Sequence, residues 1–167
     1  GAQPYSTSTD SSEYGLGGDL TGGTANFDWA FYNAISNGGN KSHMWRTLTM
    51  DEWDYRFHGR NNSNNKFAPA TVNDVHGFVV LSDVPLDTTS LPFNSVSDGA
   101  KGWNSNIYTK AQWLRMEKTG AVFLPAAGER YNGNKVKNCG TTGSYWTTSA
   151  YRMKNAYYIL FSEQNLS

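Results

Sequence analysis

The chain has 167 residues, 14 basic and 14 acidic side chains, and a formal net charge of zero. A chain of this length can bury the core of one domain without disulfide bonds. Its neutral charge argues against a protein that binds nucleic acid or a membrane surface through bulk positive charge. Aromatic residues make up 14% of the chain and charged residues only 17%. This composition is typical of extracellular recognition, and equally of a loop-rich secreted domain.

Cys139 is the only cysteine, which excludes an intrachain disulfide and a cluster of thiolate metal ligands. We expect its side chain to be small, apolar and buried. No apolar run approaches the roughly 18 residues that a membrane span needs. The chain opens on "GAQPYSTSTDSSEYGLGG" without a methionine, so we expect that any targeting segment has already been removed.

Residues 1–24 are rich in serine, threonine and glycine, and we predict a flexible lead-in there. Residues 25–167 are predicted to form a single domain. It begins with "NFDWAFYNAISNGG", in which aromatic residues alternate as on a half-buried strand. A turn at "SNGGN" and a short strand at "MWRTL" (44–48) are expected to follow.

The segment "TMDE" (49–52) matches a capping box, in which a threonine hydroxyl and a glutamate satisfy each other's free backbone amides. The predicted helix covers residues 50–59 and ends at Gly59. Its spacing places three apolar residues on one face: Met50, Trp53 and Phe57. Two pairs of opposite charge are spaced i, i+4: Glu52 with Arg56, and Asp54 with His58.

The middle of the chain predicts strands and loops. "NNSNN" (61–65) is a polar loop, and "ATVNDVHGFVVLSDV" predicts a hairpin that turns between Asp74 and Gly77. Residues 84–107 include Pro85, Pro92 and Gly99, which favour turns. We predict a long irregular loop there, and such loops are often functional.

A second capping box, "TKAQ" (109–112), starts a predicted helix that ends near Gly120, with Trp113, Leu114 and Met116 available for the core. "AVFLPAAG" predicts a buried strand and "ERYNGNKVKNCGTTG" a polar loop. "SYWTTSAY" and "NAYYILF" predict two paired strands around residues 152–155. The expected fold class is therefore α+β, with two helices and short, mainly antiparallel strands.

The titratable side chains give no catalytic pattern. The three histidines lie in three different predicted elements: His43, His58 and His76. The best acidic cluster is Asp51, Glu52 and Asp54. It falls in the first helical turns, where the helix dipole favours negative charge. A structural role is therefore favoured over the paired carboxylates of a hydrolase.

We therefore predict a protein that is not an enzyme and has no cofactor. One alternative concerns calcium, which accepts carboxylate and carbonyl oxygens without a strict motif. Loop oxygens between Asp83 and Asp98 could form such a site, although no EF-hand pattern supports it.

Three segments carry a resemblance to a known family: "WRTLTMDEWDYRF" (45–57), "GAVFLPAAG" (120–128) and "GSYWTTSAYRMKNAYYILF" (143–161). They resemble paralogous surface and secreted domains of gut Bacteroidetes and Fibrobacter. In that family "WRTLT-x-x-EW", "GAVFLPAAG" and "YWSST…NAYYLYF" recur. "WRTLTMDEW" is also similar to the "RLPTEAEWE" segment of formylglycine-generating enzymes. Those enzymes, and the ligand-binding proteins diversified by retroelements, share a C-type-lectin-like fold.

The resemblance covers about residues 26–161 and implies this fold, at a secreted or bacterial cell-surface location. The chain departs from the relatives in three ways. The enzymes use a cysteine pair, and this chain has only Cys139. "GWNSN" (102–106) lacks the acid of the calcium motif of sugar-binding C-type lectins. The closing strand that ends "SVRLV" in relatives is missing after "SEQNLS", so we expect a truncated chain or a partner chain that completes this edge.

In lectin-like folds the ligand surface usually lies on loops and strands of the C-terminal half. The resemblance therefore implies a non-catalytic adhesion module that binds a protein or glycan on a host or neighbouring cell. Its expected ligand-binding residues are Arg130, Tyr131, Asn132, Asn134, Lys135, Tyr151, Arg152, Lys154 and Gln164. In a retroelement-diversified member these positions would vary between copies.

Three further aromatic residues of this region are expected to lie in the core instead: Trp146, Tyr157 and Tyr158. Two alternatives to the adhesion module stay open. One is a structural or tip component of a bacterial surface assembly. The other is a divergent enzyme on a scaffold like that of the sulfatase-modifying factors, which would need a convergent set of titratable groups.

Overall fold

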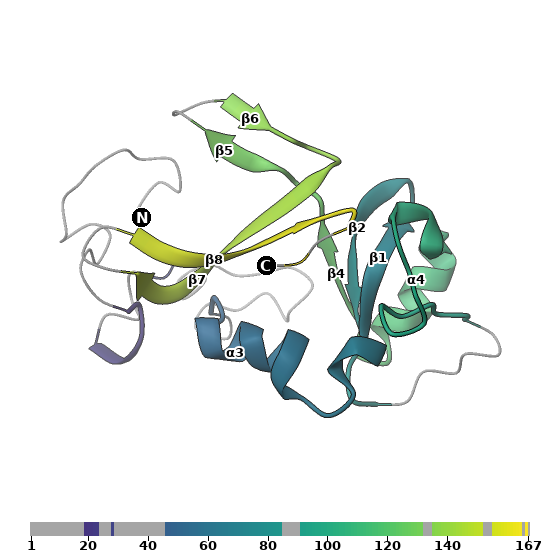
Figure 1. Ribbon diagram of the computed structural model, residues 1–167, viewed down its shortest axis with the longest axis horizontal. Coiled ribbons are helices and arrows are strands. Elements are labelled where there is room, and N and C mark those ends of the chain that lie inside the picture. The colour runs from purple at the N-terminus through teal and green to yellow at the C-terminus, as the bar shows by residue number, and fades with distance from the viewer. Residues whose placement is uncertain are drawn as a thin grey trace. The chain divides into compact units, whose positions relative to one another are not determined.

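The structure is a computed structural model, and it describes residues 19–23, 28, 46–84, 91–131, 135–151, 155–164 and 166. Within these residues the predicted mixed α+β class is confirmed, with two α-helices and several short, mostly antiparallel strands (Figure 1). The chain divides into two compact units. The first unit comprises Gly1–Trp53 and Tyr145–Ile159, and the second comprises Asp54–Ser144 and Leu160–Ser167.

A four-stranded sheet in the order β3-β1-β2-β4 organises the second unit. Its strands are β1 (Phe67–Val72), β2 (Val75–Val80), β3 (Ile107–Tyr108) and β4 (Val122–Pro125). β2 is antiparallel to β1 and to β4, whereas β3 is parallel to β1. The strand predicted in "AVFLPAAG" is therefore β4, but only Leu124 of its four residues is buried, so the prediction of a buried strand is wrong.

β1 and β2 form the predicted hairpin, but its turn is Asn73-Asp74. Both turn residues have a positive φ, 47° and 64°, which two-residue hairpin turns require and which Asn and Asp tolerate. The predicted turn between Asp74 and Gly77 is therefore wrong, because Val75, His76 and Gly77 already pair within β2.

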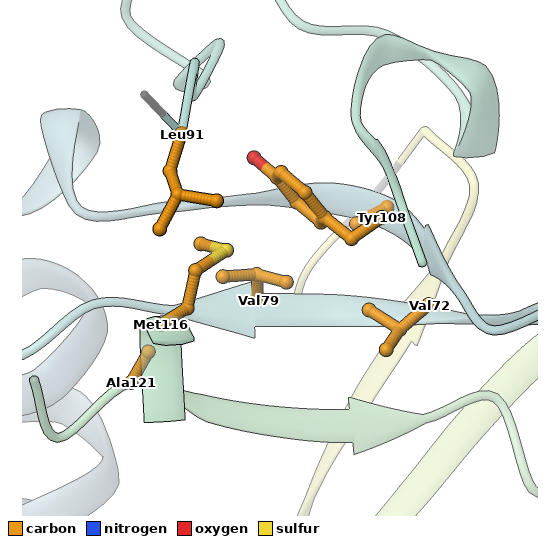
Figure 2. Packing of buried hydrophobic residues seen from close by; sticks show 7 residues of the cluster. Val72, Val79, Leu91, Tyr108, Met116 and Ala121 are labelled. Atoms are coloured by element: carbon orange, nitrogen blue, oxygen red, sulfur yellow. The ribbon is translucent and has the colours of Figure 1, made fainter. Parts of the chain in front are cut away.

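The core of the second unit lies between this sheet and helix α4 (Lys110–Glu117). Met116 of α4 is fully buried and points toward Val79 and Leu91 (Figure 2). Trp113 packs against this cluster, whereas Leu114 is 46% exposed, so its predicted core position is wrong. The second capping box is confirmed, with the Gln112 amide 3.3 Å from the Thr109 hydroxyl and the Thr109 amide 2.8 Å from the Gln112 side chain.

Buried Asn106 holds the long loop before α4 in place. Its amide nitrogen donates to the Pro69 carbonyl at 3.1 Å and to the Asn94 carbonyl at 2.9 Å. Its oxygen accepts from the Asn94 amide at 2.8 Å and from the Tyr108 hydroxyl at 3.2 Å. This side chain therefore joins the described loop residues 91–106 to β1 and β3, and Ile107, which was predicted in the loop, already belongs to β3. The described loop residues contain one short 3-10 helix, Trp103–Ser105.

The predicted helix over residues 50–59 is an α-helix followed by a π-helix: α3 (Met50–Asp54) and η3 (Tyr55–Gly59). The first capping box is confirmed, because the Glu52 amide lies 3.2 Å from the Thr49 hydroxyl and the Thr49 amide lies 2.9 Å from the Glu52 carboxylate. In the second unit, Phe57 is buried and packs edge-on against Phe67 at 5.1 Å. The short 3-10 helix Ser63–Asn65 follows.

One of the two predicted charge pairs is confirmed. His58 lies 2.9 Å from Asp54, but Glu52 pairs with Arg46, which precedes the helix, and not with Arg56. The Arg46 bond and the Thr49 amide lower the pKa of Glu52 from 4.5 to about 2. Of the acidic residues in α3, Glu52 is thus part of its cap.

Replacing Glu52 by glutamine is expected to remove the ion pair and keep the cap. Because the folded-state pKa of Glu52 is depressed, its charge stabilises the protein above about pH 4.5, and this contribution disappears as the pH falls toward 2. The side chain is 38% exposed, so we expect at most about 1 kcal/mol at pH 7. Urea unfolding of both proteins from pH 2 to pH 7 measures this difference. A difference that stays constant with pH would contradict the assignment.

β7 (Thr142–Tyr151) and β8 (Asn155–Ser162) form the predicted pair of strands (Figure 1). Their residues contribute to both units. In the first unit, the Thr148 amide donates to the Leu48 carbonyl at 3.0 Å. Residues 46–48 are nevertheless not in a strand, so this part of the predicted strand at "MWRTL" is wrong. The predicted strand and turn within residues 26–40 lie outside the described residues, apart from Asp28.

Candidate functional site

The predicted ligand-binding residues fall on three separate segments. Arg130, Tyr131 and Lys135 lie in a hairpin of the second unit, Tyr151 ends β7 in the first unit, and Gln164 follows β8 in the second unit. The other four predicted residues lie outside the described residues: Asn132, Asn134, Arg152 and Lys154.

The hairpin consists of β5 (Glu129–Tyr131) and β6 (Lys135–Lys137). It forms where a polar loop was predicted, so that prediction is wrong. Glu129 lies opposite Lys137 and Tyr131 lies opposite Lys135. The first pair joins opposite charges, which stabilises a cross-strand pair. The sequence does not show this strand pair, because neither three-residue strand is long enough to show the alternation of apolar and polar residues by which a strand is recognised.

The turn after β6 exposes Cys139. Asn138 has a φ of 59°, and its carbonyl accepts from the Thr141 and Thr142 amides at 3.0 Å each. The prediction of a buried Cys139 is therefore wrong.

Four aromatic side chains are exposed on β7 and β8, all within the first unit. We call them the aromatic surface: Trp146 (63% exposed), Tyr158 (48%), Tyr151 (41%) and Tyr157 (39%). The rings form two pairs, Trp146 with Tyr158 at 5.5 Å and Tyr151 with Tyr157 at 5.1 Å. Because Tyr157 and Tyr158 are successive in one strand, the two pairs lie on opposite faces.

This exposure corrects the sequence prediction, which placed Trp146, Tyr157 and Tyr158 in the core. The buried residues of these two strands in the first unit are Ile159 of β8 and, directly after Trp146 in β7, Thr147 and Thr148. Both strands contain hydroxyl and amide side chains but no charged residue. The aromatic surface is therefore uncharged and solvent-exposed, with one ring pair on each face of the β7–β8 pair.

A shallow pocket of about 80 Å³ lies in the second unit. Its lining comes from β1, β2, the turn over residues 96–101 and the segment that follows β8. It includes Gln164, so one predicted site residue borders a cavity. The lining residues are Phe67, Pro69, Phe78, Val96, Ala100, Lys101, Glu163, Gln164 and Leu166.

Two acidic residues of the predicted calcium loop have protein partners, and the third, Asp87, lies outside the described residues. Asp83 accepts from the Lys66 ammonium, and Asp98 accepts from the Ser95 hydroxyl. These hydrogen bonds lower the pKa of both carboxyl groups. No group of three or more His, Cys, Asp or Glu side chains that could hold a metal occurs among the described residues. The calcium site stays a prediction.

The two described histidines also have partners. His76 stacks on Trp103 at 5.4 Å, and its Nδ1 lies 2.9 Å from the Gly140 carbonyl. His58 pairs with Asp54 at the protein surface. His43 lies outside the described residues. Both described histidines thus have local structural contacts.

Comparisons with protein-family models, with curated proteins and with solved structures found no match for this chain. None of the helices in the described parts of the chain is both long and apolar enough to span a membrane. The aromatic surface and the pocket are thus the features from which a function can be argued.

Proposed function

We propose that the chain is a non-catalytic extracellular module that binds a protein or glycan ligand through its aromatic surface. The observation that carries the proposal is the exposure of four aromatic side chains on two strands without a charged residue. Tyrosine and tryptophan give large contact areas and lose little side-chain entropy on binding. They are also enriched among the residues that dominate binding energies.

The uncharged character of the strands favours a neutral ligand surface. Burial of a charged side chain in an interface is unfavourable unless it finds a partner, and β7 and β8 would bury none. An aromatic ring can stack on the apolar face of a sugar or on a partner's apolar side chain. Tyrosine hydroxyls can donate hydrogen bonds at the same time. Both ligand classes therefore fit.

We also propose the C-type-lectin-like fold and a secreted or bacterial cell-surface location. The family resemblance of residues 45–57, 120–128 and 143–161 supports both. The confirmed elements within these segments are the capped helix α3, strand β4 and the β7–β8 pair. The non-catalytic character is supported by the acidic residues of α3, among which Glu52 forms the cap.

Replacing Trp146 by alanine is expected to weaken ligand binding about tenfold, because a tryptophan that a ligand covers contributes strongly to affinity. Tyr151→Ala is expected to have a smaller effect. Arrays of glycans and of cell-surface proteins, probed with and without EDTA, would identify the ligand and any calcium dependence. Titration of the best ligand then gives the affinity of each variant.

Tyr55→Ala is the matched control for this experiment. Tyr55 is also exposed, at 53%, but lies in the second unit, away from β7 and β8 in the sequence. The Tyr55→Ala variant should bind the ligand with the same affinity as the unaltered chain. If Trp146→Ala and Tyr151→Ala bind every ligand as tightly as the unaltered chain, the aromatic surface is not the binding site.

A structural component of a surface assembly is the second candidate. No described strand pairs with Asn155–Ile159 of β8 on the side away from β7. An uncharged strand edge of this kind can accept a strand from another chain. Absence of binding on every array, together with loss of surface assembly on deletion of the protein, would favour this function.

A further inference from the structure

The pocket in the second unit has an apolar, rigid floor. Phe67 and Phe78 are 5% and 3% exposed, and their rings stack at 6.3 Å. Phe78 also packs against buried Phe161 at 4.8 Å. Because these rings are fixed by their neighbours, the floor would lose little conformational entropy when a partner group covers it.

The two sides of the pocket are also held in place. On one side, the Val96 amide donates to the Phe67 carbonyl at 3.1 Å, and the Asp98 carboxylate accepts from the Ser95 amide at 3.0 Å. On the other side, the Gly102 amide donates to the Glu163 carbonyl at 3.3 Å. Backbone hydrogen bonds therefore hold both sides of the pocket in a fixed position within the second unit.

The volume of the pocket limits the size of the group that can bind in it. Sites for small-molecule ligands and cofactors usually enclose about 300–1,000 Å³, and this pocket holds about 80 Å³. A sugar ring would bring several hydroxyl groups onto a floor of phenylalanine and proline side chains, where they would lose hydrogen bonds. A single aliphatic side chain fits both the size and the chemistry.

Two charged side chains line the pocket, Glu163 and Lys101, and they add a second requirement. The Glu163 carboxylate already accepts a hydrogen bond from the Trp103 amide at 3.4 Å. Lys101 is exposed, and its ammonium forms no ion pair with a carboxylate in the described parts of the chain. Its backbone is fixed, since the Ser105 hydroxyl accepts from its amide and donates to its carbonyl. A partner that places an acidic group beside its aliphatic side chain would pair with this ammonium.

We propose that this pocket is an anchor site for a protein partner, which inserts one aliphatic side chain and pairs an adjacent acidic side chain with Lys101. The site is separate from the aromatic surface of the first unit and does not depend on the function proposed for that surface. It adds a second recognition surface, with a preference for an aliphatic residue next to aspartate or glutamate.

Selection from a library of random linear twelve-residue peptides, displayed on phage, tests this proposal on the full chain. Sequences with leucine, isoleucine or valine next to an acidic residue are expected to be enriched. Ala100→Leu fills the pocket and should weaken the selected peptides about tenfold, the loss expected for a removed hydrophobic contact. Lys101→Gln should weaken them about two- to fivefold, an effect that decreases at high salt.

Val96→Lys is a second way to block the pocket and keeps the experiment decisive if Ala100→Leu does not fold, because Val96 is 37% exposed. Trp146→Ala should bind the selected peptides normally, which separates this site from the aromatic surface. Enrichment that is equal on the blocked and unblocked proteins would overturn the proposal. Enrichment of peptides without the aliphatic and acidic pair would overturn it as well.

Discussion

Met116→Ala is expected to lower the free energy of unfolding by about 2–5 kcal/mol. The Met116 side chain is fully buried and points from α4 into the cluster of Val79, Leu91 and Tyr108 (Figure 2). Truncation to alanine removes its burial free energy and leaves a cavity that the surrounding strands can fill only in part. Urea unfolding at neutral pH, followed by circular dichroism, measures the loss.

Leu114→Ala provides the control on the same helix. Leu114 is 46% exposed, so its truncation should change the free energy of unfolding by only about 0.5 kcal/mol. Met116→Leu keeps most of the volume and should cost less than about 1.5 kcal/mol. A result in which Leu114→Ala destabilises the protein as much as Met116→Ala would contradict the packing of α4.

Local chemistry made several elements predictable from the sequence. Both helix starts follow from capping boxes at Thr49 and Thr109, because a hydroxyl and a side chain three residues later form a pattern visible in the sequence. The β1–β2 hairpin follows from two apolar runs separated by turn residues. The position of its turn was wrong because the prediction left Asn73 in the first strand and extended the turn to Gly77, although Val75 already pairs within β2.

Other elements depend on contacts distant in the sequence. The sequence around Glu52 does not show that it forms its ion pair with Arg46 instead of Arg56, since both arginines are close enough in the sequence to pair with it. The β5–β6 hairpin has no apolar face, so its pairing depends on backbone hydrogen bonds and on Glu129 opposite Lys137. The sequence does not distinguish Asn106 from other loop residues, because its role depends on the carbonyls of Pro69 and Asn94, which only the fold brings near it.

The candidate site was predicted in part. The sequence directs attention to the C-terminal half, where Tyr151 belongs to the aromatic surface and Gln164 lines the pocket. It misplaced Trp146, Tyr157 and Tyr158, because an aromatic residue in a strand is more often buried than exposed. The pocket itself could not be predicted, since Phe67 and Glu163 lie almost a hundred residues apart.

Gly128→Ala is expected to lower the free energy of unfolding by about 2–5 kcal/mol, because two unfavourable effects add at this position. Gly128 has a φ of +76°, a conformation that disfavours side chains, and a Cβ atom there would lie 2.2 Å from the Lys137 carbonyl oxygen. The alanine would push β6 away from the start of β5. Predicted binding residues Arg130 and Lys135 would then lose their register, which hydrogen exchange of the hairpin amides can detect.

Gly140→Ala separates the two effects. Gly140 has nearly the same backbone conformation, with a φ of +80°, but no atom lies within 4 Å of its Cβ position. It should therefore show only the backbone strain, about 1–2 kcal/mol. The difference between the two variants then measures the contact between Gly128 and β6. Equal destabilisation by both would mean that β6 yields freely to the added methyl group, and that this hairpin is too loosely held to present its basic side chains in a fixed arrangement.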